Sequence, residues 1–235
     1  DFRKVKGLIL LGPTEWEKAM TSRDRRNRNL LNLQPGWCPR PEIPWSLDQL
    51  KKLVELCRTP EWTTMPILYL ALPDVEGRPA SLVGQYSWWG VEHDNLGPGE
   101  VRNNVFWANW FVNENLDWKH ERAVNMPTWL IGYEHPRWAT NKTWQLQQKI
   151  AASEQYDMSI ASAAQDALML NLCLAARGKK LRATTYSRTQ TVCDGYPLGV
   201  KSDGDGVDVS RDWIPEFACD DITASVQGMP RLLAA

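Results

Sequence analysis

The sequence predicts an α+β fold in which helices pack on short antiparallel strands. Helical periodicity is confined to a few segments, of which 46–57, 142–155 and 160–177 are the clearest. Short β-like segments lie between and after them, without the regular alternation of strand and helix that a parallel α/β sheet requires. The length of 235 residues is enough for one core, so we expect a single domain over 1–235.

The charge and the hydrophobic content argue against several classes of protein. Lys and Arg number 27 and Asp and Glu number 28, and this balance argues against nucleic acid as a partner and against a polybasic membrane anchor. A hydrophobic content of 43% argues against general disorder. No apolar run approaches the roughly 20 residues of a membrane-spanning helix, and no signal peptide is visible.

The cysteines and histidines form no recognisable motif. The five cysteines are an odd number without a C-x-x-C pair, which favours a reducing, cytoplasmic location and leaves zinc-ribbon and thioredoxin-like sites without their signature. His93, His120 and His135 do not have the spacing of zinc ligands, so we expect each to be a lone polar residue. The cellular location is otherwise open.

Residues 1–44 are predicted to be an irregular N-terminal segment. Near its middle lies a short basic patch, most simply a solvated turn, with RNA binding as the weaker alternative. This patch consists of Arg23, Arg25, Arg26 and Arg28. Several prolines then form a stiff connection to the next segment.

Residues 45–185 are predicted to be a scaffold of helices and strands. Ser46 and Gln49 have the spacing of a capping box at the start of a helix, and Gly178 is placed to end the helix 160–177. On that second helix Ala164, Leu168 and Leu172 are expected to pack onto a sheet. Buried strands are predicted at 66–72, 105–112 and 128–133, and 73–103 is predicted to be rich in loops.

The 13 tryptophans have two interpretations. The simpler one is an aromatic core cluster that compensates for a small number of regular elements. The alternative is a platform on which carbohydrate rings stack. The residues of that platform would be Trp88, Trp89, Trp107 and Trp110.

An acidic stretch near the C-terminus gives a weak calcium hypothesis. Asp203, Asp205 and Asp208 alternate with glycine and valine, and carboxylates in such a loop can bind a hard cation. The spacing departs from the EF-hand pattern, so a simple turn between two strands is the competing interpretation.

Residues 186–230 combine a regular pattern with an irregular one. The face expected to be buried carries Leu198, Val200, Val207 and Val209, and the face expected to be exposed carries Gly199, Lys201, Asp208 and Ser210. Between these positions, apolar, charged and small residues are mixed in a way typical of a binding surface. The candidate ligand-binding residues are Tyr196, Asp203, Asp205, Asp208, Ser210, Arg211, Ile214, Pro215, Phe217 and Asp220.

A family resemblance rests on the same region. Its elements are Tyr186-Ser187-Arg188-Thr189, Gly195, Leu198, Val200, Gly206-Val207, Val209, Trp213 and Ile222-Thr223-Ala224-Ser225-Val226. Upstream, a strand with Trp129, a Lys-Thr-Trp helix start at 142–144 and an Ala-rich helix fit the same template. Over roughly 125–230 the chain thus resembles the variable target proteins of diversity-generating retroelements, in particular a compact bacterial group known from metagenomes.

The resemblance implies a C-type-lectin-like fold, related to that of formylglycine-generating enzymes. In this family an error-prone reverse transcriptase mutates adenines, so that Asn-type codons of the region 186–230 change while a fixed scaffold displays the result. All ten candidate residues can arise from such codons, whereas Lys201 and Glu216 cannot. Cys193 and Cys219 are either displayed residues or a bridge.

The sequence therefore predicts a non-enzymatic ligand-binding protein without a cofactor, whose ligand is an unidentified protein or surface. Two alternatives stay open. One is the carbohydrate-binding module with a Trp platform. The other is an enzyme on a formylglycine-generating-enzyme-like fold, which would need a reactive cysteine pair or a His-rich iron site.

Overall fold

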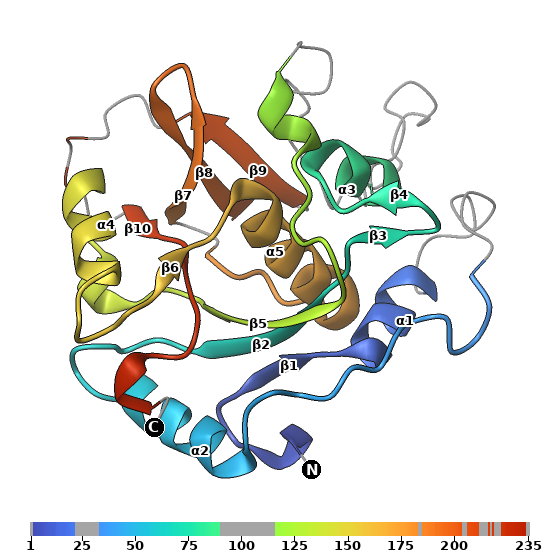
Figure 1. Ribbon diagram of the computed structural model, residues 1–235, viewed down its shortest axis with the longest axis horizontal. Coiled ribbons are helices and arrows are strands. Elements are labelled where there is room, and N and C mark those ends of the chain that lie inside the picture. The colour runs from blue at the N-terminus through green and yellow to red at the C-terminus, as the bar shows by residue number, and fades with distance from the viewer. Residues whose placement is uncertain are drawn as a thin grey trace.

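The computed structural model describes residues 2–21, 33–89, 116–182, 185–203, 206–211, 216, 218 and 222–233. This part of the chain has an α+β architecture with five α-helices and mixed sheets (Figure 1). The helices are α1 (Pro13–Thr21), α2 (Leu47–Cys57), α3 (Leu82–Trp89), α4 (Trp144–Ala151) and α5 (Ala163–Arg177). Short 3-10 helices add Phe2–Lys4, Asp117–His120, Arg137–Ala139 and Arg231–Leu233.

The first sheet has five strands in the order β1-β2-β5-β11-β6. These strands are β1 (Ile9–Leu11), β2 (Pro66–Ala71), β5 (Thr128–Tyr133), β11 (Val226–Gln227) and β6 (Ser159–Ile160). β1 and β2 are parallel, and the other neighbours are antiparallel. β2 is buried along its whole length because it lies between two other strands and is rich in Ile, Leu and Tyr.

The second sheet has four strands in the order β10-β7-β8-β9. They are β10 (Ile222–Ala224), β7 (Tyr186–Cys193), β8 (Tyr196–Asp203) and β9 (Gly206–Arg211). β10 runs parallel to β7, so each main sheet is mixed, whereas the sequence predicted short antiparallel strands. A two-stranded hairpin, β3 (Asp74–Val75) with β4 (Arg78–Pro79), stands apart from them.

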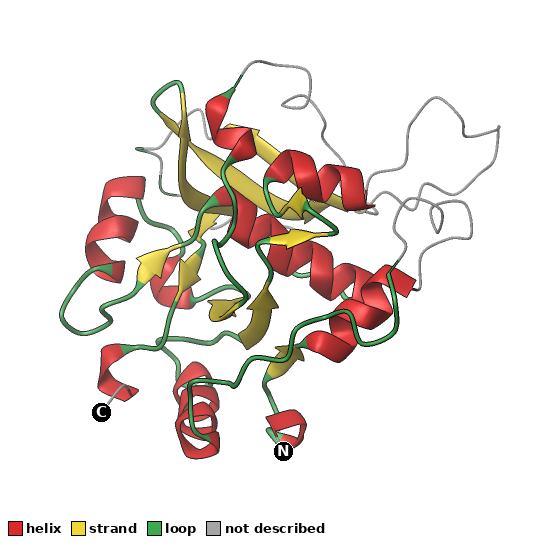
Figure 2. Ribbon diagram, turned by 45° about the vertical axis from the view of Figure 1, so that its right-hand side comes forward, coloured by secondary structure: helices red, strands yellow, loops and turns green. Residues whose placement is uncertain are grey.

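Helix α5 lies between the two main sheets, as the views in Figures 1 and 2 both show. Residues on all its faces are buried, including Ala164, Leu168 and Leu172, and this placement explains why its sequence is rich in Ala and Leu. The prediction that these three residues pack on a sheet is confirmed. α5 approaches β5 closely at Gly132, because a Cβ there would come within 2.4 Å of the Met169 sulfur and would force that side chain to move.

A buried polar network joins α5 to both sheets. Arg182 Nη1 lies 2.6 Å from each carboxylate oxygen of Asp166, and the two side chains are 0% and 1% exposed. Arg182 also donates to the main-chain oxygens of Tyr133 and Glu134, and Ser225 Oγ donates to Asp166. Ser225 is the residue between β10 and β11, so this network fixes the point where the chain passes from one sheet to the other.

Tryptophan side chains occupy the core, as the aromatic-cluster interpretation predicts. Trp16, Trp62 and Trp88 are at most 1% exposed. Trp16 packs edge-on against Trp88 at 6.1 Å, and Trp62 contacts Tyr133, Trp138 and Tyr156. Such rings bury a large apolar surface each.

The N-terminal third contains more regular structure than predicted. Residues 9–11 and 13–21 form β1 and α1, although 1–44 was expected to be irregular, and α3 lies within the expected loop region 73–103. A three-residue strand is specified by its pairing with β2 and its burial, which local periodicity does not report. The arginine patch and the expected strand 105–112 lie outside the described residues.

The predicted helix caps are present, with shorter helices than expected. Ser46 and Gln49 form a capping box on α2, and Gly178 ends α5 in the left-handed conformation with φ of 64°. The last two helices are trimmed relative to the predictions 142–155 and 160–177. Thr143 caps α4 and Ser162 caps α5, so Ser159 and Ile160 are free to pair as β6.

Candidate ligand-binding site

The sheet β10-β7-β8-β9 separates two kinds of side chain, as the alternating pattern predicts. Leu198, Val200, Val207 and Val209 are 0% exposed and belong to the hydrophobic core. On the other face the strand register places Gly199 opposite Ser210 and Lys201 opposite Asp208. These four residues therefore share the outer face of the sheet. The four buried residues, called the anchors below, fix the sheet to the core on its inner face.

A tyrosine from β7 crosses the outer face. Tyr186 Oη donates to Asp208 Oδ2 over 2.5 Å, and the Lys201 ammonium lies 4.5 Å from the centroid of the Tyr186 ring. Gly199 lies beneath the ring, since a Cβ on Gly199 would come within 3.1 Å of it. Burial and the hydrogen bond to Asp208 raise the pKa of Tyr186, so its hydroxyl stays protonated and donates.

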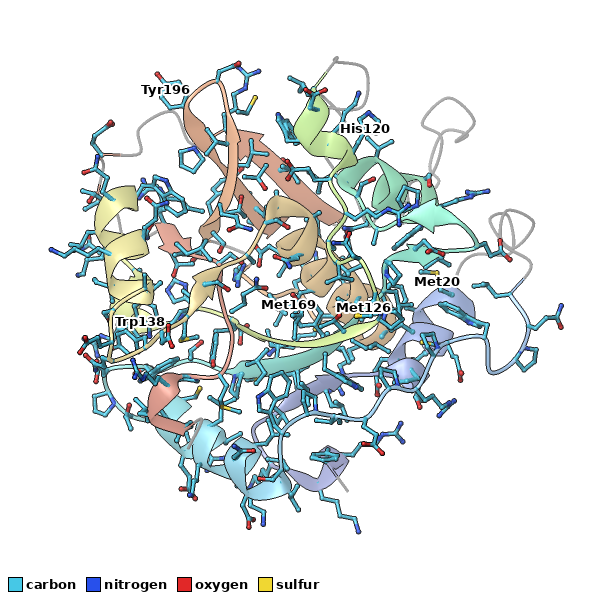
Figure 3. The ribbon with its side chains drawn as sticks, in the orientation of Figure 1. Met20, His120, Met126, Trp138, Met169 and Tyr196 are labelled. Carbon is cyan, nitrogen blue, oxygen red and sulfur yellow. The ribbon has the colours of Figure 1, made fainter. Side chains whose placement is uncertain are left out.

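The β7–β8 hairpin forms the tip of the surface. Asp194 and Gly195 turn the chain with φ angles of 52° and 86°. Asp194 forms an ion pair with Arg211 of β9, with 2.9 Å between Oδ2 and Nη1. Tyr196 follows the turn at the outer end of the hairpin (Figure 3).

Helix α4 borders the outer face and is held there by a buried arginine. Arg188 of β7 is fully buried and donates from Nη1 to the main-chain oxygen of Lys142 over 2.9 Å. The same nitrogen lies 3.5 Å from Gln147 Oε1, and Gln147 Nε2 donates to Ala139 O. Arg188 therefore fixes the N-terminus of α4 next to the sheet.

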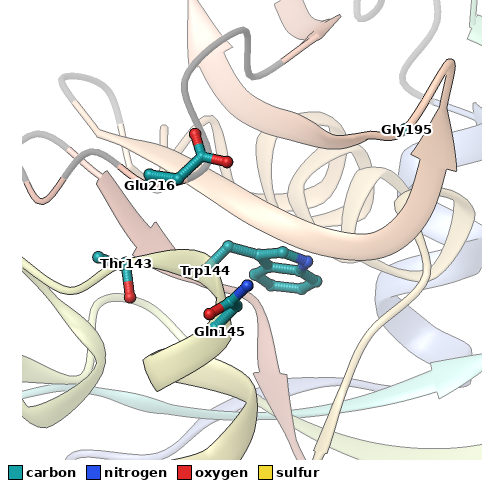
Figure 4. Close-up of a pocket in the computed structure, with 5 residues that line it drawn as sticks. All are labelled: Thr143, Trp144, Gln145, Gly195 and Glu216. Atoms are coloured by element: carbon teal, nitrogen blue, oxygen red, sulfur yellow. The ribbon is translucent and has the colours of Figure 1, made fainter.

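A pocket of about 340 Å³ lies where α4 meets the hairpin tip. The described residues that line it are Thr143, Trp144, Gln145, Gly195 and Glu216 (Figure 4). Trp144 is 8% exposed, and the close-up shows the Glu216 carboxylate opposite Trp144 and Gln145. The pocket therefore combines an aromatic ring, an amide and a carboxylate, which suits a ligand with both apolar and hydrogen-bonding groups.

The structure describes the side chains of four of the ten candidate residues, and all four have intramolecular contacts. Tyr196, Asp208, Ser210 and Arg211 lie on β8 and β9. Arg211 lies opposite the buried Leu198 in the register, so its side chain leaves the sheet on the other side from Ser210. Asp203 ends β8, with its side chain outside the described part. Asp205, Ile214, Pro215, Phe217 and Asp220 lie outside the described residues.

Residues that sequence reasoning did not choose also belong to the site. Lys201 and Glu216 cannot arise from Asn-type codons, so neither is a candidate residue. Nevertheless, Lys201 contacts the Tyr186 ring, and Glu216 lines the pocket. Thr143, Trp144 and Gln145 come from a helix some way back along the chain. The Lys-Thr-Trp helix start was the available signal for them, although nothing in its spacing points to a pocket.

The calcium hypothesis stays a prediction. The side chains of Asp203 and Asp205 lie outside the described part, and the Asp208 carboxylate accepts a hydrogen bond from Tyr186. Among the described residues, no three His, Cys, Asp or Glu side chains are grouped closely enough to hold a metal ion.

The Trp platform meets a direct obstacle. Trp88 is 0% exposed and packs on Trp16, so it cannot stack on a ligand. Trp107 and Trp110 lie outside the described residues, and so does the side chain of Trp89.

The described cysteines are unreactive by position. Cys38, Cys57, Cys173 and Cys193 are buried, free thiols, and the free state of Cys193 does not support a bridge to Cys219, which lies outside the described part. Burial raises the pKa of Cys57 to about 12 and that of Cys173 to about 11, which leaves almost no thiolate at neutral pH.

Comparison of the chain with family models, with curated proteins and with solved structures gave no match. No helix in the described ranges is long and apolar enough to cross a membrane.

Proposed function

We propose that the protein is a non-enzymatic ligand-binding protein whose C-terminal surface is diversified by a retroelement reverse transcriptase. In this proposal the scaffold has a C-type-lectin-like fold, and the ligand is a protein or a surface. The proposal combines the family resemblance of 125–230 with the site geometry. Neither the Trp platform nor the enzyme alternative is favoured by an observation on the described residues.

One observation carries the proposal most strongly. The four anchors, Leu198, Val200, Val207 and Val209, are fully buried, while the residues between them alternate onto the outer face. Substitutions at exposed positions usually change stability by no more than about 0.5 kcal/mol, whereas deletions in a core cost several times that. A surface supported in this way can be changed repeatedly without loss of the fold.

The pocket beside the surface supports the same proposal. Its described lining contains none of the ten candidate residues, although Gly195 is adjacent to Tyr196 and Glu216 lies between Pro215 and Phe217. In this proposal, residues that vary thus adjoin Gly195 and Glu216 of the pocket. Binding energy in such an interface depends on a few well-placed side chains, so changes at the border can alter specificity.

A pair of display libraries tests the proposal. One library varies Tyr196 and Ser210, and the matched control varies the anchors Leu198 and Val209 on the same two strands. We expect most members of the first library to be folded, as judged by protease resistance on the yeast surface, and to yield binders to a purified test protein. Few members of the second should fold. Equal folded fractions in the two libraries, or a first library that does not fold, would contradict the proposal.

A further inference from the structure

A second pocket, of about 390 Å³, lies away from the candidate site and shares no described lining residue with it. It is formed where the segment 33–39 meets the end of β2, the hairpin β3–β4 and the residue before β5. Its described lining consists of Leu33, Trp37, Pro39, Leu72, Pro73, Asp74, Val75, Glu76 and Pro127.

The walls of this pocket are apolar and stiff. Trp37 is half-buried, and its ring packs edge-on against the fully buried Trp16 at 6.2 Å and 84°. Trp16 is itself held by a hydrogen bond of 2.7 Å from Nε1 to Leu70 O. Three proline rings complete the walls, and proline has little conformational freedom to lose when a ligand binds.

One side of the pocket is acidic. Asp74 is the first residue of β3, and Glu76 lies in the tight turn of the hairpin, where Glu76 and Gly77 have φ angles of 52° and 74°. The Gly77 amide donates to Asp74 Oδ1 over 3.2 Å, which orients that carboxylate. Neither carboxylate has an ion-pair partner in the described part of the chain, and the described lining contains no Lys or Arg.

We propose that this pocket binds an arginine side chain of a partner polypeptide. A guanidinium group is planar and weakly hydrated, so it can lie against the Trp37 ring while it donates to a carboxylate. The proline walls suit the apolar stem of the side chain. Met126, which is 67% exposed and precedes the lining residue Pro127, would provide an apolar contact for residues that flank the arginine. This inference is independent of the proposed function.

The probes are two peptides, acetyl-Leu-Arg-Leu-amide and the same peptide with citrulline in place of arginine. Citrulline is the neutral isostere of arginine, with a urea group where arginine has a guanidinium group. Binding is followed through the Trp37 indole N–H signal in ¹⁵N NMR spectra, assigned with Trp37→Phe. We expect the arginine peptide to shift this signal and to bind at least about fivefold more tightly than the citrulline peptide, with weaker binding at high salt. We also expect it to bind more tightly than Nα-acetyl-arginine amide, because the flanking leucines contact the apolar surface.

Variants of the acidic side test the assignment further. Asp74→Asn keeps an oxygen that can accept from the Gly77 amide. The double variant Asp74→Asn/Glu76→Gln should weaken binding of the arginine peptide by about fivefold and leave the affinity for the citrulline peptide unchanged. Glu55→Gln, on the exposed side of α2, is the matched control and should have no effect. Equal affinity for both peptides, affinity no better than that of Nα-acetyl-arginine amide, no shift at Trp37, or insensitivity to the acidic variants would each overturn the inference. Thermal unfolding of the variants verifies that they are folded.

Discussion

Tyr186 and Asp208 are joined across an intervening strand of the outer face. Tyr186 belongs to β7 and Asp208 to β9, they are joined by a hydrogen bond of 2.5 Å, and the Tyr186 ring lies over Gly199 of the strand between them, β8. Because β8 carries no side chain at that point, the tyrosine can lie flat against the sheet. Asp208, a candidate ligand-binding residue, is therefore also a structural partner.

We predict that Tyr186→Phe and Asp208→Asn each destabilise the protein and that their effects are not additive. A hydrogen bond to a carboxylate on a partly exposed face should contribute about 1 kcal/mol, so the coupling energy should be of that size. Urea unfolding of the wild type, both single variants and the double variant measures it. Strictly additive effects would mean that the two groups do not interact in solution.

The anchors and the outer face should respond very differently to truncation. Leu198→Ala removes a fully buried side chain and is expected to cost about 2–5 kcal/mol of unfolding free energy. Ser210→Ala, on the next strand and the opposite face, should cost less than about 1 kcal/mol. Chemical denaturation of both variants compares them directly, and similar costs would argue against the two-sided arrangement.

The buried ion pair between Arg182 and Asp166 should be intolerant of partial removal. Asp166→Asn leaves Arg182, which is 0% exposed, without a counter-charge, and we expect a loss of about 3–5 kcal/mol. Asp48→Asn is the control, since its pair with Lys51 is exposed and should contribute less than about 1 kcal/mol. If Asp166→Asn unfolds at the same denaturant concentration as the control, the pair is not buried as described.

His135 should make stability depend on pH. Burial and the neighbouring Arg182 lower the pKa of His135, with Glu134 acting in the opposite direction. The unfolded chain therefore binds a proton at higher pH than the native protein does, so stability should fall as the pH drops below the unfolded value of about 6.5. His135→Gln should flatten this part of the pH profile of the unfolding free energy.

The exposed His120 provides the control for that measurement. His120→Gln should leave the slope between about pH 5 and pH 7 close to that of the wild type. An unchanged slope in His135→Gln, or an equal change in both variants, would contradict the assignment of the effect to His135.

The sequence predicted those parts of the fold that local signals specify. The caps at Ser46 and Gly178 and the buried alternation of Leu198 and Val200 follow from short-range chemistry, and the structure has all of them. β1 was missed because a three-residue strand depends on its parallel pairing with β2. The parallel pairing of β10 with β7 is likewise a long-range relationship.

The site was predicted less completely for the same physical reason. Alternation correctly placed Asp208 and Ser210 on one face, and the same rule applied to Arg211 would have placed it on the other. The lining residues at the start of α4 depend on Arg188 of β7, which is distant in the sequence and holds the helix against the sheet. Such a contact has no signature in the local sequence.

The central claim is that the C-terminal surface is diversified by a retroelement, and DNA sequencing beside the gene tests it most directly. The proposal predicts a near-copy of the codons for 190–225 next to a reverse-transcriptase gene, with mismatches confined to adenines of the copy. Those mismatches should include the codons of Tyr196, Ser210 and Phe217 and spare those of Leu198, Val200, Lys201 and Glu216. No such copy, together with an unvarying sequence of this region across isolates, would contradict the claim.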